Sequence, residues 1–400
     1  MTKGVGGSTA AVELAGLARW ADPAPRIGAE EREARLEKAR RLMAEAGAEA
    51  LLVRGGASLR YFTGVTWGQS ERLVAMVLGR RGKPVMICPA FEAGTLEASL
   101  RIEAEARFWE EDESPFELTA AVLRDMGAGS VAIEPQTPFF VFDGLRKAAP
   151  SLSLVDGAPI VDGCRMVKSP AELALMSQAK AMTLEVQRRA ARMLAPGVTT
   201  GEVARFIDEA HRRLGADGGS SFCQVQFGAV TQYPHGKPGE QSLAEGDLVL
   251  IDTGCLVDGY NSDITRTYVF GEPGEAVRRV WDTEKAAQAA AFAAVRPGVP
   301  CEAIDAAARQ VLEAAGYGPD YRLPGLPHRT GHGIGLSIHE PAYLVRGDRT
   351  PLAPGMCFSN EPMLVVPGAF GVRLEDHFHV TEDGAAWFTE PSPSLDAPFG

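Results

Sequence analysis

The chain has 400 residues, 45% of them hydrophobic and 23% charged, and its formal net charge is −12 at pH 7. That length exceeds a usual single domain and predicts two, and the acidic balance argues against nucleic acid or an anionic membrane as a partner. Six scattered cysteines include no Cys-x-x-Cys pair, and no apolar run resembles a membrane span or a secretory signal. We therefore expect reduced thiols and a cytoplasmic location.

The first part of the chain alternates between helix and strand patterns. Residues 29–47 have the apolar spacing of an amphipathic helix that ends at a glycine, and 117–126 is a second helical segment. We expect an α/β domain with a mixed sheet over residues 29–164, preceded by a tail at 1–28. Short apolar runs between turn signals predict its strands at 50–53, 74–78, 84–88 and 131–134.

A long helix begins the second domain. Ser169 is a credible N-cap, with Pro170 at the first helical position and Glu172 in the first turn. The helical pattern continues over 171–194. We place the boundary at residue 165 and expect the second domain to span 165–400.

The second domain contains an internal repeat. The sequence Pro196-Gly197-Val198 precedes an amphipathic helix that ends at Gly215, and Pro297-Gly298-Val299 precedes another that ends at Gly316. The offset between the two copies is constant at 101 residues. Chance similarity of two alanine-rich helices is one explanation. The other is a pseudo-symmetric domain whose halves each supply part of one site.

Two aspartates flank a turn signal in the first half of this domain. Asp252 lies in the apolar run 248–254, which predicts a buried strand, and a buried carboxylate needs a partner or a metal ion. Asp263 follows it, and Asp258-Gly259 between them favours a hairpin. A turn centred near 257–258 would set the two aspartates roughly opposite each other on one face.

A second hairpin repeats this arrangement. Glu361 and Glu375 are symmetric about Gly368, so their carboxylates are expected across a turn from each other. His332 has glycine on both sides, which lets the backbone approach closely and leaves room for the ring. Four carboxylates and one imidazole suit two divalent cations bridged by carboxylates and a hydroxide. The oxygen-rich set favours Mn²⁺, with Fe²⁺, Co²⁺ or Zn²⁺ as alternatives.

The ordered set Asp, Asp, His, Glu, Glu resembles that of the pita-bread metallopeptidases, which include methionine aminopeptidase, aminopeptidase P, prolidase and the metal-free creatinase. The motif Leu59-Arg60-Tyr61-Phe62-Thr63-Gly64 resembles the family's first-domain signature, and 165–176 resembles its linker. The resemblance covers about residues 30 to 385 and is greatest to bacterial Xaa-Pro dipeptidases. It implies a creatinase-like N-terminal domain and an α+β pita-bread catalytic domain with pseudo-two-fold symmetry.

The resemblance also implies a function and its ligands. A dinuclear-metal peptidase would hydrolyse the Xaa-Pro bond of dipeptides through a metal-bridging hydroxide. All five positions match the family's ligands: Asp252 would bind one metal in a bidentate way, Asp263 and Glu375 would bridge both, and His332 and Glu361 would complete the second.

Further residues match the family's substrate-binding and proton-transfer positions. His235, His328 and His339 match its three histidines, and Arg373 matches an arginine that binds the substrate carboxylate or orders the site. Glu361 would also accept a proton from the nucleophile and pass it to the proline nitrogen. Val365 departs from the pattern, because most proline-specific relatives have tyrosine there.

Several alternatives remain open. A Xaa-Pro aminopeptidase would act on longer peptides, a non-peptidase C–N hydrolase would share the scaffold, and a metal-free binding protein would keep only the fold. The expected partners are proline-containing dipeptides or short peptides and a second copy of the chain, whose site Trp67 and Arg72 are candidates to reach. His211 is expected at the surface, whereas His377 and His379 are candidates for positions beside Glu375.

Overall fold

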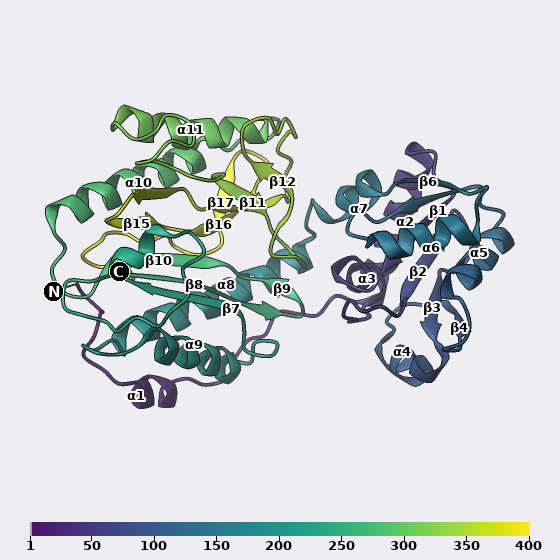
Figure 1. The fold of residues 1–400 in the computed structure, drawn as a ribbon, viewed down its shortest axis with the longest axis horizontal. Coiled ribbons are helices and arrows are strands. Elements are labelled where there is room, and N and C mark those ends of the chain that lie inside the picture. Colours follow the sequence, from purple (N-terminus) through teal and green to yellow (C-terminus); the bar gives the residue numbers. More distant parts are fainter. Residues whose placement is uncertain (1) are drawn as a thin grey trace. The chain divides into compact units, whose positions relative to one another are not determined.

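The computed structural model describes residues 2–400, which form two compact units (Figure 1). One unit is Ile27–Arg165, and the other combines Met1–Arg26 with Met166–Gly400.

The unit Ile27–Arg165 is built on a six-stranded sheet in the order β4-β3-β2-β1-β5-β6. The pairs β1–β2 and β2–β3 are antiparallel, and the other three pairs are parallel. The predicted mixed sheet is therefore confirmed, and each predicted strand lies within one residue of an observed one. The strands are β1 Ala50–Arg54, β2 Ala75–Gly79, β3 Val85–Pro89, β4 Glu105–Trp109, β5 Ser130–Ile133 and β6 Ser153–Asp156.

Helices cover this sheet, which is why the central strands are continuous apolar runs. Every residue of β1, β2 and β3 is buried, as expected for strands covered on both faces. Leu52 and Val77 of the sheet share a core with Leu123 and Leu145 of two helices. The helical segments are α2 Ala29–Glu45, α3 Ala57–Thr63, η1 Ala90–Glu92, α4 Ala93–Ser99, α5 Pro115–Asp125, α6 Phe139–Ala148 and α7 Ala158–Arg165.

The second unit contains three sheets. One has the order β10-β8-β7, with β9 paired to β8; another has the order β12-β11-β13-β16-β17; and β14-β15 is a two-stranded ribbon. Figure 1 shows α8 and α9 along one side of these sheets and α10 and α11 along the other. The strands are β7 Ser220–Phe227, β8 Leu248–Val257, β9 Tyr260–Asn261, β10 Ile264–Val269, β11 Gly331–Gly333, β12 Glu340–Leu344, β13 Cys357–Asn360, β14 Met363–Val366, β15 Phe370–Arg373, β16 Asp376–Val380 and β17 Ala385–Trp387.

The helical segments of this unit are α1 Ala10–Ala15, α8 Pro170–Arg192, α9 Thr200–Leu214, η2 Gly228–Gln232, α10 Glu275–Ala294 and α11 Cys301–Ala314. Helix α8 begins as predicted. Ser169 and Glu172 form a reciprocal capping box, and Pro170 occupies the first turn. No helix within residues 2–400 is long and apolar enough to cross a membrane.

The internal repeat is visible in backbone hydrogen bonds. Gly197 N donates to Leu243 O at 2.8 Å, and 101 residues later Gly298 N donates to Leu352 O at the same distance. The returning bonds, from Leu243 N to Val198 O and from Leu352 N to Val299 O, are both 2.9 Å. The turn before α9 and the turn before α11 are thus equivalent, which confirms the pseudo-symmetric domain.

The segment expected as an N-terminal tail is hydrogen-bonded to the rest of its unit. Thr2 N donates to Gly271 O, Gly6 N to Ala191 O and Ser8 N to Arg192 O. Its helix α1 has Thr9 as a side-chain N-cap.

Candidate active site

The first pair of aspartates lies on a tight hairpin. Val257 pairs with Tyr260, so the turn residues are Asp258 and Gly259, both with positive φ as a two-residue hairpin turn requires. This corrects the predicted turn centre by one residue. Asp252 pairs with Thr265 rather than lying opposite Asp263, so the two aspartates are diagonal neighbours. They still share a face, because diagonal positions two residues apart point the same way.

The second pair of acidic residues follows the predicted register. Asn360 pairs with Asp376, and Met363 pairs with Arg373, so both pairs are centred on residue 368. Glu361 lies between these positions and its counterpart is Glu375. The backbone N–H of Glu361 donates to Thr330 O at 2.8 Å, and that of Glu375 donates to Thr265 O at 3.0 Å, which fixes both residues where the sheets meet.

His332 points its ring into this acidic group. Its Nδ1 lies 3.0 Å from Gly333 O, and because a carbonyl only accepts, Nδ1 carries the proton and Nε2 has a free lone pair. The flanking glycines are needed for close packing. A Cβ on Gly331 would lie 2.1 Å from Ser359 O, and one on Gly333 would lie 2.6 Å from Glu340 O.

The five predicted ligands converge. His332 Nε2 is 3.1 Å from Glu361 Oε1 and 3.9 Å from Asp263 Oδ2. Ligand atoms of Asp263, His332 and Glu375 all lie within 4.8 Å of one another. Asp252 is a diagonal neighbour of Asp263 on the same face of the hairpin and accepts from Arg373 Nη2.

The carboxylates of this group are buried and lie close to one another, and both conditions affect their pKa values. Burial, followed by the charges of neighbouring carboxylates, raises the pKa of Asp263 and the pKa of Glu375 well above the ordinary range. Burial also opposes ionisation of Glu361, but nearby positive charge, including that of Arg373, outweighs this and lowers its pKa. Glu361 is also the more accessible of its pair, with 14% of its side chain exposed against 2% for Glu375.

Arg373 is fully engaged within the protein. Its Nη2 donates to Asp252 Oδ2 at 2.5 Å, its Nη1 to Pro234 O at 3.0 Å, and its Nε to Thr265 Oγ1 at 3.1 Å. The arrangement connects an acidic residue to the loop that carries His235. Of the two roles left open for Arg373, this geometry favours ordering of the site.

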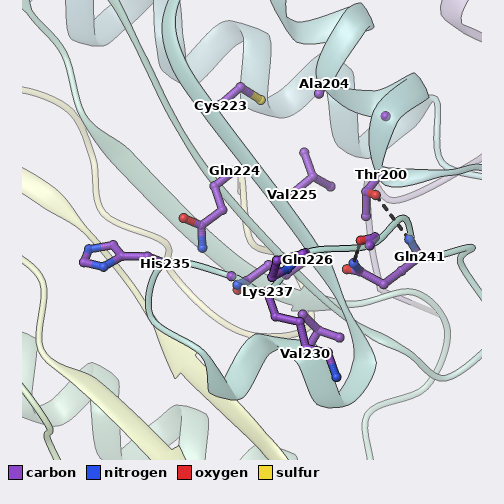
Figure 2. A pocket seen from close by; sticks show the side chains of 14 residues that line it. Thr200, Ala204, Cys223, Gln224, Val225, Gln226, Val230, His235, Lys237 and Gln241 are labelled. Carbon is purple, nitrogen blue, oxygen red and sulfur yellow. Dashed lines mark hydrogen bonds between the residues drawn. The ribbon is translucent and has the colours of Figure 1, made fainter.

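His235 is exposed and lies at one end of a pocket of about 460 Å³. Figure 2 shows its ring pointing away from the opposite end of the pocket, where Thr200 and Gln241 lie. Gln224 and Gln226 of β7 hold the loop before His235, by donating to Pro234 O and Tyr233 O. The pocket therefore runs along the edge strand β7 and ends at His235.

The other two histidines border the acidic group. The ring centroid of His339 lies 4.1 Å from that of His332. Burial, followed by the neighbouring His332 ring and the charge of Arg329, lowers the pKa of His339 to about 4. His328 Nδ1 is 2.7 Å from Arg329 O, while its buried Nε2 has no hydrogen-bond partner among the described residues. Because Nδ1 carries the proton, Nε2 of His328 is an acceptor.

Three histidines outside the ligand set can be compared with their predicted positions: His211, His377 and His379. His211 was expected at the surface, but it is completely buried and contacts Thr183 Oγ1 at 3.1 Å and Ser220 Oγ at 2.9 Å. Both hydroxyls come from other elements, so the helix pattern alone could not reveal them. His377 does lie beside Glu375, with Nε2 3.7 Å from Oε1, whereas His379 packs on Phe388.

Comparison with known proteins identifies the family. The family model for metallopeptidase family M24 matches residues 174–382, and that for the creatinase/prolidase N-terminal domain matches residues 35–167. The chain belongs to metallopeptidase family M24. The probable dipeptidase PepE of Mycobacterium bovis is 38% identical over 368 residues, covering 90% of this chain and 95% of that protein.

Solved structures of family M24 members have the same fold. Dipeptidase PepE from Mycobacterium ulcerans is 34% identical with a TM-score of 0.85, covering 94% of this chain and all of that one. A recombinant prolidase from Thermococcus sibiricus is 30% identical with a TM-score of 0.83, covering 92% and 98%. These findings confirm the fold class: a creatinase-type N-terminal domain followed by a pita-bread catalytic domain. They also make the chain a metallopeptidase of the dipeptidase group.

The donor set fits the metal dependence of family M24. Asp252 Oδ1, Asp263 Oδ1 and Glu375 Oε1 are buried without a hydrogen-bond partner among the residues described. Ionised carboxylates and the Nε2 of His332 can only accept, so they cannot satisfy one another. Divalent cations would supply the missing positive charge, because carboxylate and imidazole ligands suit them.

Proposed function

We propose that this chain is a Xaa-Pro dipeptidase that uses two divalent cations, held by Asp252, Asp263, His332, Glu361 and Glu375. The observation that carries the proposal is the convergence of four carboxylates and a neutral imidazole with three buried oxygens left unpaired. The prolidase name of the Thermococcus sibiricus neighbour supports the substrate class. Cations in this site would supply Lewis acidity towards the scissile carbonyl and towards a water molecule.

The residues of the chain would then position the substrate and move protons. Glu361, ionised and the more accessible of its pair, accepts a proton from the attacking water and passes it to the proline nitrogen. That nitrogen is a tertiary amide without an N–H, so it must be protonated before it leaves. The Nε2 of His328 offers an acceptor to the substrate's amino group.

His339 would act on the scissile carbonyl, and His235 would act on the residue that leaves. The pKa of His339 is about 4, so at neutral pH it donates one N–H towards the developing oxyanion without carrying charge. His235 lies at the mouth of the pocket along β7, where residues after the scissile bond would extend. Arg373 donates to both Asp252 and Pro234 and so fixes the position of the His235 loop relative to Asp252.

A specific observation favours a second candidate, a Xaa-Pro aminopeptidase. The pocket next to His235 holds about 460 Å³, which is space for residues beyond proline. Each of the three guanidinium nitrogens of Arg373 already donates to a group of the protein, so its orientation is fixed by the site and not by a substrate carboxylate. The discriminating experiment compares hydrolysis of Ala-Pro and Ala-Pro-Ala by protein loaded with Mn²⁺, Co²⁺ or Zn²⁺.

We expect cleavage of Ala-Pro, most rapidly with Mn²⁺, and two ions per chain by metal analysis. Asp263→Ala or Glu375→Ala should reduce the content to one ion. Cleavage of Ala-Pro-Ala alone would replace the dipeptidase with the aminopeptidase. Inactivity on every X-Pro peptide with two ions bound would point to a non-peptidase C–N hydrolase.

We further propose a cytoplasmic homodimer. All six cysteines are free thiols, which suits a reducing compartment. Light scattering tests the dimer, and equal activity of diluted monomer and dimer would argue against a contribution of Trp67 or Arg72 to a neighbouring site.

A further inference from the structure

Two buried glutamines occupy equivalent positions in the two halves of the catalytic domain. Gln187 lies on α8 and Gln288 on α10, the helices that precede α9 and α11, and both side chains are completely buried. They are separated by 101 residues, the same offset that relates Pro196 to Pro297. The two glutamines are therefore counterparts within the internal repeat.

Gln187 bridges the two strands of the first acidic hairpin. Its Nε2 donates to Ile251 O at 3.0 Å and to Ile264 O at 2.9 Å. Ile251 directly precedes Asp252, and Ile264 directly follows Asp263. A single amide group thus fixes the backbone beside both aspartates.

Gln288 does the same for the second acidic pair. Its Nε2 lies 3.2 Å from Leu374 O and 3.4 Å from Asn360 O, and these residues directly precede Glu375 and Glu361. The same Nε2 also lies 3.1 Å from Asp376 Oδ2, the residue directly after Glu375. The contact is reciprocal, because Asn360 Nδ2 donates to Gln288 O at 2.9 Å. The second half therefore repeats the bridge of the first with different acidic residues.

The repeat extends one helical turn towards the N-terminus of each helix. Thr183 and Glu284 are also 101 residues apart. Thr183 Oγ1 lies 2.7 Å from Ser262 Oγ, next to Asp263, and Glu284 Oε1 accepts from Leu374 N at 3.3 Å. In both halves the same two helical positions face the backbone that carries the acidic residues.

We propose that Gln187 and Gln288 are a symmetry-related pair of positioning residues, each of which sets the separation of the two carboxylates in its half of the metal site. The inference rests on the ligand set of the proposed function. A primary amide suits the task, because it offers two N–H groups from a position that the helix fixes. Gln187 directs them to two carbonyls, and Gln288 shares them among two carbonyls and the Asp376 carboxylate. A metal site needs ligands held to within a fraction of an ångström, and groups behind the ligands provide this constraint.

A purely structural role would have different consequences. Gln178 provides the matched control, because it lies on the same helix α8, is also buried, and accepts from Ala24 N at 2.6 Å. Its hydrogen bond holds the N-terminal segment and does not contact either hairpin. Loss of Gln178 should reduce stability alone, whereas loss of Gln187 or Gln288 should also weaken metal binding.

The experiment measures cation affinity directly. Metal-free Gln187→Leu, Gln288→Leu and Gln178→Leu are titrated with Mn²⁺ by calorimetry and with Co²⁺ by its visible absorption, and their thermal stability is recorded in parallel. We expect affinity to fall 10- to 100-fold for the first two and to stay within about twofold for Gln178→Leu. The Co²⁺ band should also shift in the first two, because the carboxylate separation changes.

One isosteric variant and two shortened variants make the test independent of packing. Gln187→Glu keeps the size of the side chain but faces two carbonyl oxygens with a carboxylate, so it should lose at least as much affinity as the leucine variant. Should a leucine variant fold poorly, Gln187→Asn and Gln288→Asn keep the amide one methylene short and should show a smaller loss. Wild-type affinity and an unchanged Co²⁺ spectrum in folded Gln187 and Gln288 variants would overturn the positioning role alone. A wild-type chain that binds no divalent cation would instead refute the proposed function and this role with it.

Discussion

Replacement of Arg373 by methionine tests the electrostatic reasoning most directly. The guanidinium is 3% exposed and donates to Asp252, to the carbonyl of Pro234 and to the hydroxyl of Thr265. Arg373→Met keeps most of the side-chain length but removes all three donors. In the metal-free protein the Asp252 carboxylate would then remain buried without its cationic partner.

The magnitude follows from the burial of this ion pair. Removing one partner of a buried pair costs about 3–5 kcal/mol, and leaving two neutral acceptors unpaired adds about 1 kcal/mol each if water does not reach them. We expect the metal-free variant to lose about 4 kcal/mol of unfolding free energy where water reaches the two acceptors, and about 6 kcal/mol where it does not. With saturating Mn²⁺ the loss should be less than half of that, because the cations offset the charge of Asp252.

Urea denaturation with chelator and with Mn²⁺ measures both values. Arg278→Met is the matched control: its guanidinium makes a bidentate pair with Asp396 at 2.7 and 2.8 Å, but the pair is exposed, so no measurable change is expected. A metal-free Arg373→Met as stable as wild type, with a raised KM for Ala-Pro but not for Ala-Pro amide, would refute the reasoning. Arg373 would then bind the substrate carboxylate.

Three further predictions follow from buried or crowded positions. Burial lowers the pKa of His211 to about 4 from 6.5; the unfolded chain therefore takes up the proton first, and stability that is complete above pH 6.5 should fall by up to about 3 kcal/mol towards pH 4. In urea denaturation, His211→Asn should make the unfolding free energy less dependent on pH between 6.5 and 4. A pH dependence equal to that of wild type would contradict the lowered pKa of His211. Gly331→Ala places a Cβ 2.1 Å from Ser359 O and should cost about 3 kcal/mol of stability, whereas Gly94→Ala meets nothing within 4 Å and should cost none; equal melting temperatures would argue against the steric account. His339→Ala should lower kcat about 10²-fold with metal content unchanged, because His339 is not one of the five proposed ligands; loss of metal in this variant would show that it is a ligand.

Val365 stands where the family resemblance implies a tyrosine, and the structure shows what the backbone does at this position. Its N–H donates to Gly325 O at 3.0 Å, its carbonyl oxygen accepts from Gly325 N at 3.2 Å, and its side chain is buried. The residue where proline-specific relatives have tyrosine thus anchors the 324–327 stretch by its backbone. The backbone pairing at this position does not depend on a phenol.

Local chemistry in the sequence determined the hairpins and therefore the candidate ligands. Asp258-Gly259 specifies a two-residue turn, and the symmetry of Glu361 and Glu375 about Gly368 specifies a register, because side chains on paired strands alternate with a fixed period. The constant offset of 101 residues likewise indicated a pseudo-symmetric domain as one of two explanations, and the equivalent hydrogen bonds of the two turns decide in its favour. The small error at Asp252, a diagonal rather than a direct pairing, came from a one-residue uncertainty in the turn.

The tertiary structure alone decided which groups support those ligands. Gln187 and Gln288 look like ordinary helix residues, and only the packing of α8 and α10 against the hairpins shows the carbonyls they bind. His211 is buried because hydroxyls from another helix and a strand satisfy its ring. Hydrogen bonds between distant segments leave no periodic trace in the chain, because each partner is chosen by position in space rather than by spacing in sequence.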